Sequence, residues 1–378
     1  MLLKRTLYTL VILIIIASLA GTASALFLYL LALVTNIREH YFHLIYLLPV
    51  AGLLMGFVYY KYAQPVKFYK TEEHIPLLTA PLIFISTLLS HLVGASVGRE
   101  GTAVQIGAAI ADQFSKFLKS IELDRKLLII IGIGAGFASV FGTPLAAAIF
   151  AIEVLDTKKY KYNYFFYSLF SAYIAHYICL AWGISHTNYC ISFLPGFSLM
   201  SVLWCITAGT IFGLIAYLFT SFSHFFANIS TYIKRSYLRP FIAGLVLILL
   251  YSFFDLKQYM GLGLSSISAS FTEQMHLNDF LIKLLLTTFC IGFGFKGGEV
   301  TPLFFIGSTL GNVLIWFIPL PQSLLAGMGM VAVFAAATNT PIASVFMAVE
   351  LFGWSASPWM AIACLCAYFI SSAKSIYH

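Results

Sequence analysis

An arginine and a glutamate stand side by side between two long apolar runs of the chain. The stretch from Gly98 to Gly107 reads Gly-Arg-Glu-Gly-Thr-Ala-Val-Gln-Ile-Gly, so Arg99 and Glu100 lie among glycines. Charged side chains at membrane depth cost about 2.5 to 3.5 kcal/mol each, which favours a function that requires them. A glycine-rich loop that opens a helix binds an anion through backbone N–H groups and the positive helix end. The alternative is a short extramembrane loop with a solvated ion pair.

Two motifs of the first half of the chain recur in the second half. The segment 143–153, from Thr-Pro to a final glutamate, matches the segment 340–350 at an offset of 197 residues. The segment 98–102 matches 297–301 in its glycine, glutamate and threonine at an offset of 199 residues. Two motifs in the same order and at nearly the same spacing indicate an internal duplication.

A duplicated membrane unit predicts a binding site where its two halves meet. We expect one transmembrane domain, 1–378, built of two inverted repeats at about 5–190 and 200–378. Transporters of this kind hold ions near the bilayer midplane, at interrupted helices. Glu100 and Glu299 would then approach one site from opposite halves. A carboxylate there competes with an anion for the same N–H donors, and it leaves when protonated, a form that desolvation favours.

The composition identifies a polytopic membrane protein. Hydrophobic residues make up 61% of the 378 residues, charged residues make up 9%, and the mean hydropathy is +0.93. Soluble domains have about 25% charged residues. A simple span needs about 20 apolar residues, so short or Gly/Pro-interrupted stretches predict an all-α fold with broken and re-entrant helices. The apolar stretches lie near 7–35, 42–60, 75–97, 127–152, 164–184, 199–227, 240–254, 280–296, 301–318, 323–349 and 358–371.

The first apolar stretch is predicted to be a retained membrane helix that starts in the cytoplasm. Lys4 and Arg5 precede it, as the positive-inside rule requires. The segment 23–25 (Ala-Ser-Ala) resembles a signal-peptidase site, but the apolar run continues to Thr35. A net charge of +7 suits basic loops beside anionic lipid, and no basic stripe with interleaved aromatic residues argues for nucleic acid. Further basic residues gather in 116–126, 158–161 and 234–239.

The sequence predicts no metal site and no cofactor. The six cysteines lack metal-ligand spacing with histidine, and Cys364 and Cys366 are interpreted as packing residues of an apolar helix. The His-Glu-x-x-His motif of a membrane metalloprotease does not occur. The enzymatic alternative is an intramembrane hydrolase that uses Glu100 and Glu299 as an acid pair. Such an enzyme would need an enclosed cleft for water and substrate.

These motifs resemble those of the CLC family of anion channels and proton-coupled anion transporters. The segment 98–102 resembles the loop of the family's gating glutamate, with Thr102 in place of the usual proline. The segment 141–153 resembles the pore-helix motif that follows, and 297–302 occupies the position of a later anion loop. The resemblance extends from about residue 5 to Tyr377. No long tail follows Tyr377, so the resemblance does not lead us to expect a cytoplasmic regulatory domain.

The departures from the general pattern indicate the fluoride branch of that family. Val154 stands where chloride/proton exchangers carry a second acid, and Glu299 stands where chloride-handling relatives have an apolar or aromatic residue. Gly-Arg-Glu-Gly-Thr with Gly-Gly-Glu-Val-Thr-Pro is characteristic of members that exchange fluoride for protons. The resemblance implies a homodimeric fluoride/proton antiporter that exports fluoride across a plasma (inner) membrane. A chloride/proton exchanger and a passive anion channel of the same fold are the alternatives.

The resemblance also implies roles for individual residues. Glu100 is the gate and proton carrier, and Glu299 is the branch-specific carboxylate near the central site. The hydroxyl of Thr301 is expected to hold an ion or Glu100, and the phenol of Tyr377 to close the inner side of the anion site. The structural alternative is an ion pair with Arg99 for Glu100 and a helix N-cap for Glu299. For Thr301 it is a local bond from the hydroxyl to the backbone, and for Tyr377 a terminal or interfacial aromatic residue. The other predicted ion-binding residues are Gly98, Arg99, Gly101, Thr102, Val300, Phe304 and Phe305, with core packing as the alternative for either phenylalanine.

Glu153 and Glu350, the last residues of the recurring segments 143–153 and 340–350, are expected to be structural acids that pair with backbone donors. The family's first anion loop is expected within 61–74. That stretch lacks the glycine-rich or Gly-Asn character of such a loop, so none of its residues is assigned to the ion.

Overall fold

The protein is helical throughout the part of the chain that the structure describes. The computed structural model describes residues 2–62, 74–115, 124–155, 162–371 and 375–377. Within these ranges no β-strand forms, and one isolated bridge joins Gly98 to Gly298. The all-α prediction is therefore confirmed. The helices of the first half are α1 (Leu2–His40), α2 (Leu48–Tyr62), α3 (Thr79–Leu92), α4 (Glu100–Gln113), α5 (Arg125–Phe141), α6 (Pro144–Glu153) and α7 (Tyr162–Ala181). Those of the second half are α8 (Leu199–Thr231), α9 (Arg239–Phe253), α10 (Leu264–Ala269), α11 (Asp279–Gly292), α12 (Val300–Val313), α13 (Gln322–Thr338), α14 (Pro341–Phe352) and α15 (Ser357–Ser371).

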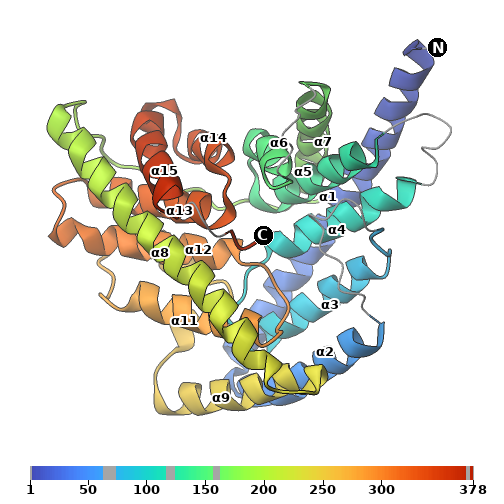
Figure 1. Ribbon diagram of the computed structural model, residues 1–378, viewed down its shortest axis with the longest axis horizontal. Coiled ribbons are helices and arrows are strands. Elements are labelled where there is room, and N and C mark those ends of the chain that lie inside the picture. Colours follow the sequence, from blue (N-terminus) through green and yellow to red (C-terminus); the bar gives the residue numbers. More distant parts are fainter. Residues whose placement is uncertain (1, 63–73, 116–123, 156–161, 372–374, 378) are drawn as a thin grey trace.

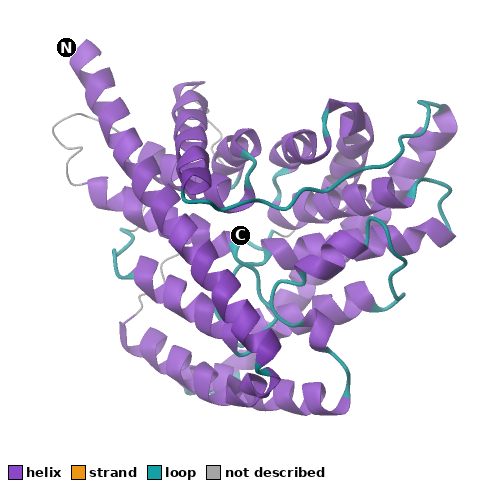
Figure 2. Cartoon of the chain, turned by 180° about the vertical axis from the view of Figure 1, so that it is seen from behind, coloured by secondary structure: helices purple, strands orange, loops and turns teal. Residues whose placement is uncertain are grey.

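The two halves are related by a pseudo-twofold rotation. Figure 1 shows α1 and α8 descending from opposite upper corners toward the lower middle of the molecule. After the half-turn of Figure 2, α1 lies where α8 lies in Figure 1. Helices α3 and α11 have 14 residues each, α4 and α12 also have 14 each, and α5 and α13 have 17 each. This is the inverted repeat that the motifs predict.

The backbone sets the register between the two repeats. The left-handed glycines after α3 and α11, Gly94 and Gly294, are offset by 200 residues, with φ of 85° and 100°. The bridged residues Gly98 and Gly298 have the same offset. The motif alignment at an offset of 199 residues is therefore wrong by one position. It paired identical residue types in a glycine-rich segment, whereas the equivalent backbone positions are 200 residues apart.

The corrected register pairs Arg99, not Glu100, with Glu299. Each of these two residues is the N-cap of its helix, Arg99 before α4 and Glu299 before α12. Glu100 is then equivalent to Val300, the first residue of α12. The two acids of the predicted site consequently do not occupy equivalent positions.

Several helices are interrupted, as the sequence predicts. Six helices within the described residues are long and apolar enough to cross a membrane, and other apolar helices are shorter. Helix α5 ends at Gly142 and α13 at Asn339, both in the left-handed conformation at the C-cap (φ 87° and 58°). Proline in the first turn then starts α6 and α14, since its missing N–H is not needed there. The chain thus turns sharply between the two helices of each pair.

Glycines let paired helices pack at backbone contact in both repeats. A Cβ on Gly107 of α4 would lie 2.1 Å from the carbonyl oxygen of Gly132 on α5. A Cβ on Gly307 of α12 would lie 2.0 Å from the carbonyl oxygen of Gly329 on α13. Small residues permit such approaches between membrane helices. These contacts fix the starts of α4 and α12 relative to the core.

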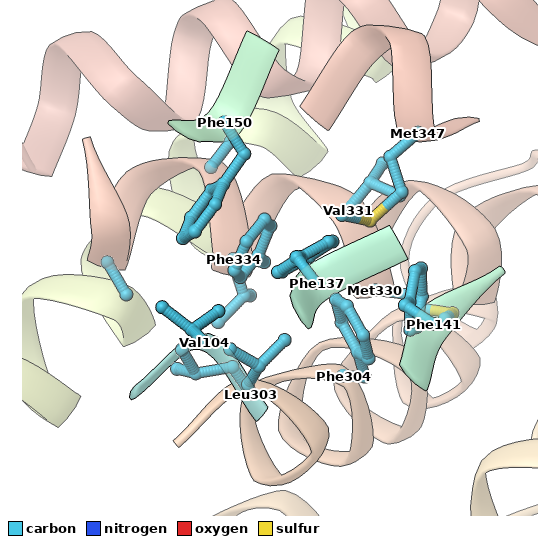
Figure 3. Packing of buried hydrophobic residues seen from close by; sticks show 14 of the residues in the cluster. Val104, Phe137, Phe141, Phe150, Leu303, Phe304, Met330, Val331, Phe334 and Met347 are labelled. Atoms are coloured by element: carbon cyan, nitrogen blue, oxygen red, sulfur yellow. The ribbon is translucent and has the colours of Figure 1, made fainter. Parts of the chain in front are cut away.

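An aromatic cluster fills the centre between the repeats. The rings of Phe137 and Phe150 stack with centroids 4.6 Å apart, and Phe150 stacks on Phe334 at 5.9 Å. Phe141 and Phe304 continue the cluster with centroids 4.9 Å apart. Figure 3 shows these side chains converging from α5, α6, α12 and α13. The cluster packs the interrupted helices around one rigid centre.

Candidate ion-binding site

The loops that open α4 and α12 meet through an antiparallel backbone bridge. Gly98 N donates to Gly298 O at 2.5 Å, and Gly298 N donates to Gly98 O at 2.8 Å. A Cβ on Gly98 would lie 2.8 Å from Gly298 O, and one on Gly101 would lie 3.0 Å from Gly298 Cα. Glycine is therefore required for this approach. The bridge brings the N-termini of both helices to one centre.

The carboxylate of Glu100 takes hydrogen-bond donors from the opposite repeat. Its Oε2 accepts from Thr301 N at 3.1 Å and from the Thr301 hydroxyl, while Arg99 Nε donates to its Oε1 at 3.3 Å. The side chain is 1% exposed. Thr301 lies in the first turn of α12, where free N–H groups and the helix dipole favour negative charge. The Thr301 hydroxyl thus contacts Glu100, one of its two expected partners.

Thr102 lies in the first turn of α4, and its hydroxyl is directed away from Glu100. Its Oγ1 hydrogen-bonds Thr87 Oγ1 on α3 at 2.8 Å, and both side chains are fully buried. The hydroxyl that replaces the usual proline of the motif therefore ties α4 to α3. The structure does not bring it to the Glu100 carboxylate.

The two acids open onto different spaces. Glu100 lines a narrow space of ≈ 10 Å³ together with Arg99, Thr301 and Phe304. Glu299 is half-buried and lines a separate cavity of ≈ 550 Å³. Glu299 Oε2 lies 3.7 Å from where a Cβ on Gly101 would stand, so the second acid lies near the loop that opens α4.

Tyr377 returns the C-terminal segment to the centre of the molecule. Figure 1 shows the C-terminus there, and Ile376 N donates to Ala337 O near the end of α13 at 3.0 Å. The Tyr377 side chain is buried and packs edge-on against Phe150, with centroids 6.5 Å apart. Its expected role at the inner side of the anion site stays a prediction.

The two phenylalanines after the Glu299 loop differ in their surroundings. Phe304 lines the narrow space beside Glu100, as expected for a residue of the site. The ring of Phe305 instead packs against Tyr259, with centroids 6.1 Å apart, and lies 5.2 Å from Lys283 Nζ. Val300 is buried at the first position of α12.

Glu153 and Glu350 cap each other's helices across the pseudo-twofold axis. Glu153 at the end of α6 accepts from the backbone N–H groups of Ile342 at 3.1 Å and Ala343 at 2.8 Å. Glu350 on α14 accepts from those of Leu145 at 2.9 Å and Ala146 at 2.8 Å. Their expected structural role is confirmed. Helix N-termini hold both acids, so neither contacts the Glu100 centre.

The sequence interpretation missed Lys296, which also lines the larger cavity. The available signal was the one that identified Glu100, a charged residue between an apolar run and a pair of glycines. The expected first anion loop gives no further site residue, because 63–73 lie outside the described residues.

The fold and the site define an ion-transporting membrane protein: an inverted repeat of interrupted helices whose N-termini and buried carboxylate meet at one centre. Residues 63–372 match the family described as voltage gated chloride channel. The chain belongs to this family, the CLC family, whose members are channels and transporters rather than intramembrane hydrolases. It is accordingly a multi-pass membrane protein, consistent with the plasma membrane of a prokaryote.

Curated relatives match nearly the whole chain. A chloride/fluoride channel protein from Pseudomonas syringae pv. tomato is 44% identical over 96% of this chain and 84% of its own length. The voltage-gated ClC-type chloride channel ClcB from Escherichia coli is 26% identical over 84% of this chain and 80% of its own length.

Solved structures give the same result for the fold. A CLC-type fluoride/proton antiporter has a TM-score of 0.94 and 35% identity, covering 98% of this chain and 97% of its own. A slow cyanobacterial Cl⁻/H⁺ antiporter has a TM-score of 0.82 at 20% identity, over 98% and 96% of the two chains, which supports the fold alone.

Proposed function

We propose that the protein is a proton-coupled antiporter that exports fluoride, with Glu100 as the gate and proton carrier. The observation that carries this proposal is the position of the Glu100 carboxylate on the amide and hydroxyl of Thr301. These donors, at a helix N-terminus, are the kind that an anion takes. Carboxylate and fluoride therefore compete for one set of donors.

Competition of this kind couples the two ions. Ionised Glu100 occupies the donors and closes the pathway. Protonated Glu100 loses its attraction to the helix start and releases Thr301 to fluoride, which needs firm donors because it holds its hydration strongly. A side chain that moves with its proton while fluoride moves the other way exchanges the two ions. Glu299 and Tyr377 border the inner part of the same route in this proposal.

The similar proteins support fluoride as the ion. The solved structure with 35% identity is named a fluoride/proton antiporter, and the relative with 44% identity is named a chloride/fluoride channel protein. The second name also favours an alternative, a passive channel that carries either halide. The two functions differ in whether an anion gradient drives protons uphill.

Glu100→Gln tests the role of the gate. In liposomes loaded with fluoride, we expect this variant to lose proton movement against its gradient, because the amide cannot carry a proton between the two sides. Fluoride efflux and external pH are recorded together. Glu273→Gln is the matched control, since Glu273 is an exposed acid of the second half. Uphill proton movement by Glu100→Gln would show that another group carries the proton.

We also infer a homodimer with one pathway in each chain. Both repeats contribute to the Glu100 centre, so the pathway closes within one chain. Large apolar side chains stay exposed on α7, α14 and α15, and a twofold interface buries such faces on both partners. They include Phe166, Phe170, Tyr177, Ile342, Leu365 and Phe369.

A covalent tandem tests the independence of the two pathways. With Glu100→Gln in one of its two copies, the tandem should keep about half of the coupled flux, as independent sites predict. Complete loss of coupled flux would show that the two chains act together.

A further inference from the structure

The larger cavity is positively charged around its single acid. Among the described residues, its lining carries the basic side chains Lys296 and Arg239 and one acidic side chain, Glu299. The volume of ≈ 550 Å³ has room for many water molecules and a hydrated halide. The cavity thus joins a basic wall to the acid that borders the candidate ion site.

Lys296 is held apart from Glu299. Its Nζ lies 4.3 Å from the centroid of the Tyr59 ring on α2, a cation–π contact. Glu299 and Lys296 act on each other electrostatically, but they form no ion pair within 4.0 Å in the part of the chain that the structure describes. Its positive charge is therefore not neutralised by direct pairing with Glu299.

The cavity lies beside the expected cytoplasmic ends of two helices. Tyr60 at the end of α2 and Ser236 before α9 are among its lining residues. Lys4 and Arg5 place the start of α1 in the cytoplasm, so α2, which follows the crossing of α1, returns to that side.

The place beside Gly94 and Ser96, the first-repeat equivalents of Gly294 and Lys296, is filled, although Arg99 lines a different cavity of ≈ 490 Å³. A Cβ on Gly94 would meet Met260, Ile45 and Arg38 at 3.2, 3.5 and 3.7 Å, whereas one on Gly294 would meet only Pro240 within 4 Å. Ser96, the equivalent of Lys296, is fully buried and hydrogen-bonds Thr287 at 2.9 Å. The inverted repeat alone therefore does not require the open, charged cavity.

We propose that this cavity is the cytoplasmic receiving chamber for fluoride, in which Lys296 supplies the positive charge that brings the anion to Glu299. The proposal rests on the fluoride transport proposed above and adds a residue and a place to it. Clefts lined by one sign of charge raise the local concentration of the opposite ion. Lys296 is a positioning residue for the ion, and Glu299 marks the inner end of the chamber.

Fluoride efflux through molecules of one orientation tests the role of Lys296. Ser236→Cys, with Cys190 and Cys366 replaced by serine, lets an impermeant thiol reagent block molecules whose cavity faces outward. In the remaining molecules we expect Lys296→Met to raise the half-saturating fluoride concentration about tenfold, with little change in maximal flux. Lys296→Arg should restore the wild-type value, and added salt should shrink the difference because it screens the charge.

Lys257→Met is the control for this series. Lys257 also places its ammonium over a ring, 4.6 Å from the centroid of Phe42, but it does not line the cavity. The Lys257→Met substitution should leave the half-saturating fluoride concentration unchanged. Equal half-saturation in wild type and Lys296→Met, or an equal shift in Lys257→Met, would overturn the proposal.

Thiol reactivity tests the charge of the chamber without any transport. Gln105→Cys places a thiol in the cavity wall, and the exposed native Cys190 is the reference. The cavity thiol should favour an anionic over a cationic methanethiosulfonate more strongly than Cys190 does, and Lys296→Met should abolish that preference. If the cavity thiol shows no greater preference for the anionic reagent than Cys190, the proposal of an anion-attracting chamber is overturned. If the preference is present but wild-type liposomes fail to move fluoride, the antiporter proposal fails and the anion-attracting cavity stands.

Discussion

The starts of α4 and α12 are equivalent in backbone and different in chemistry. Both loops present a bridged glycine, Gly98 or Gly298, and an N-cap residue. The first repeat has Arg99 at the cap, followed by the mobile-gate candidate Glu100, whereas the second has Glu299 at the cap. The inverted repeat thus supplies two helix N-termini, and under the proposed function the unequal side chains give them different tasks.

The largest effect is expected for the acid of the second repeat. Glu299→Ala should lower fluoride flux about a hundredfold, on the order of losing one preorganised polar group. Folding and dimerisation should be preserved, because Glu299 is half-buried beside a cavity. Efflux and size-exclusion behaviour are measured on the same preparation.

A second substitution separates charge from hydrogen bonding at this position. Glu299→Gln should be milder if the residue acts as a hydrogen-bonding group, and equally severe if its charge or proton matters. Normal flux with normal coupling in Glu299→Ala would remove the residue from the mechanism.

A smaller effect is expected at the first turn of α12. Thr301→Val removes the hydroxyl that donates to Glu100, and such bonds to a charged group are worth about 1.5 to 3 kcal/mol. Closure should weaken, so the number of protons moved per fluoride should fall, and Thr301→Ser should restore it. Thr102→Val is the matched control, since its hydroxyl bonds Thr87 instead. An equal loss of coupling in both valine variants would contradict the assignment.

The glycine contacts should respond alike in the two repeats. Gly107→Ala would place a Cβ 2.1 Å from a facing carbonyl oxygen, and Gly307→Ala would place one at 2.0 Å. Overpacking of this kind costs about 1 to 3 kcal/mol. We expect similar falls in thermal stability in detergent. Wild-type stability of either variant would show that its repeat has room to relax.

The smallest effect is expected at the reciprocal caps. Glu153→Gln and Glu350→Gln each weaken two bonds to a helix N-terminus, a loss of about 1 kcal/mol. Stability should fall slightly in both, while the ratio of protons to fluoride stays at the wild-type value. A change in that ratio in Glu153→Gln would place this acid on the proton route after all.

Motifs with strong local constraints were predictable from the sequence. The Thr-Pro starts of α6 and α14 follow from helix-start chemistry, which is local. That Glu153 and Glu350 pair with backbone donors was also predicted, but the donors themselves lie in the opposite repeat. Glu100 was identifiable because a charge among glycines in an apolar run has few structural explanations.

Features that depend on the meeting of distant segments were not predictable. The equivalence of Arg99 and Glu299 follows from the backbone bridge between Gly98 and Gly298. The residue types of the two motifs do not reveal this bridge. The partner of the Thr102 hydroxyl lies on another helix, and the side of α12 that Phe305 faces depends on packing against Tyr259. Lys296 acquires meaning only through the cavity that α2 and α9 enclose with it.

Coupled transport by the wild-type protein tests the central claim most directly. Liposomes loaded with fluoride and placed in fluoride-free buffer are followed with a fluoride electrode and a pH electrode, and parallel liposomes are loaded with chloride. The account predicts that fluoride efflux drives protons inward against a proton gradient, and that chloride does so far more slowly. Fluoride efflux without uphill proton movement would identify a passive channel, and equal rates for the two halides would contradict the assignment to fluoride.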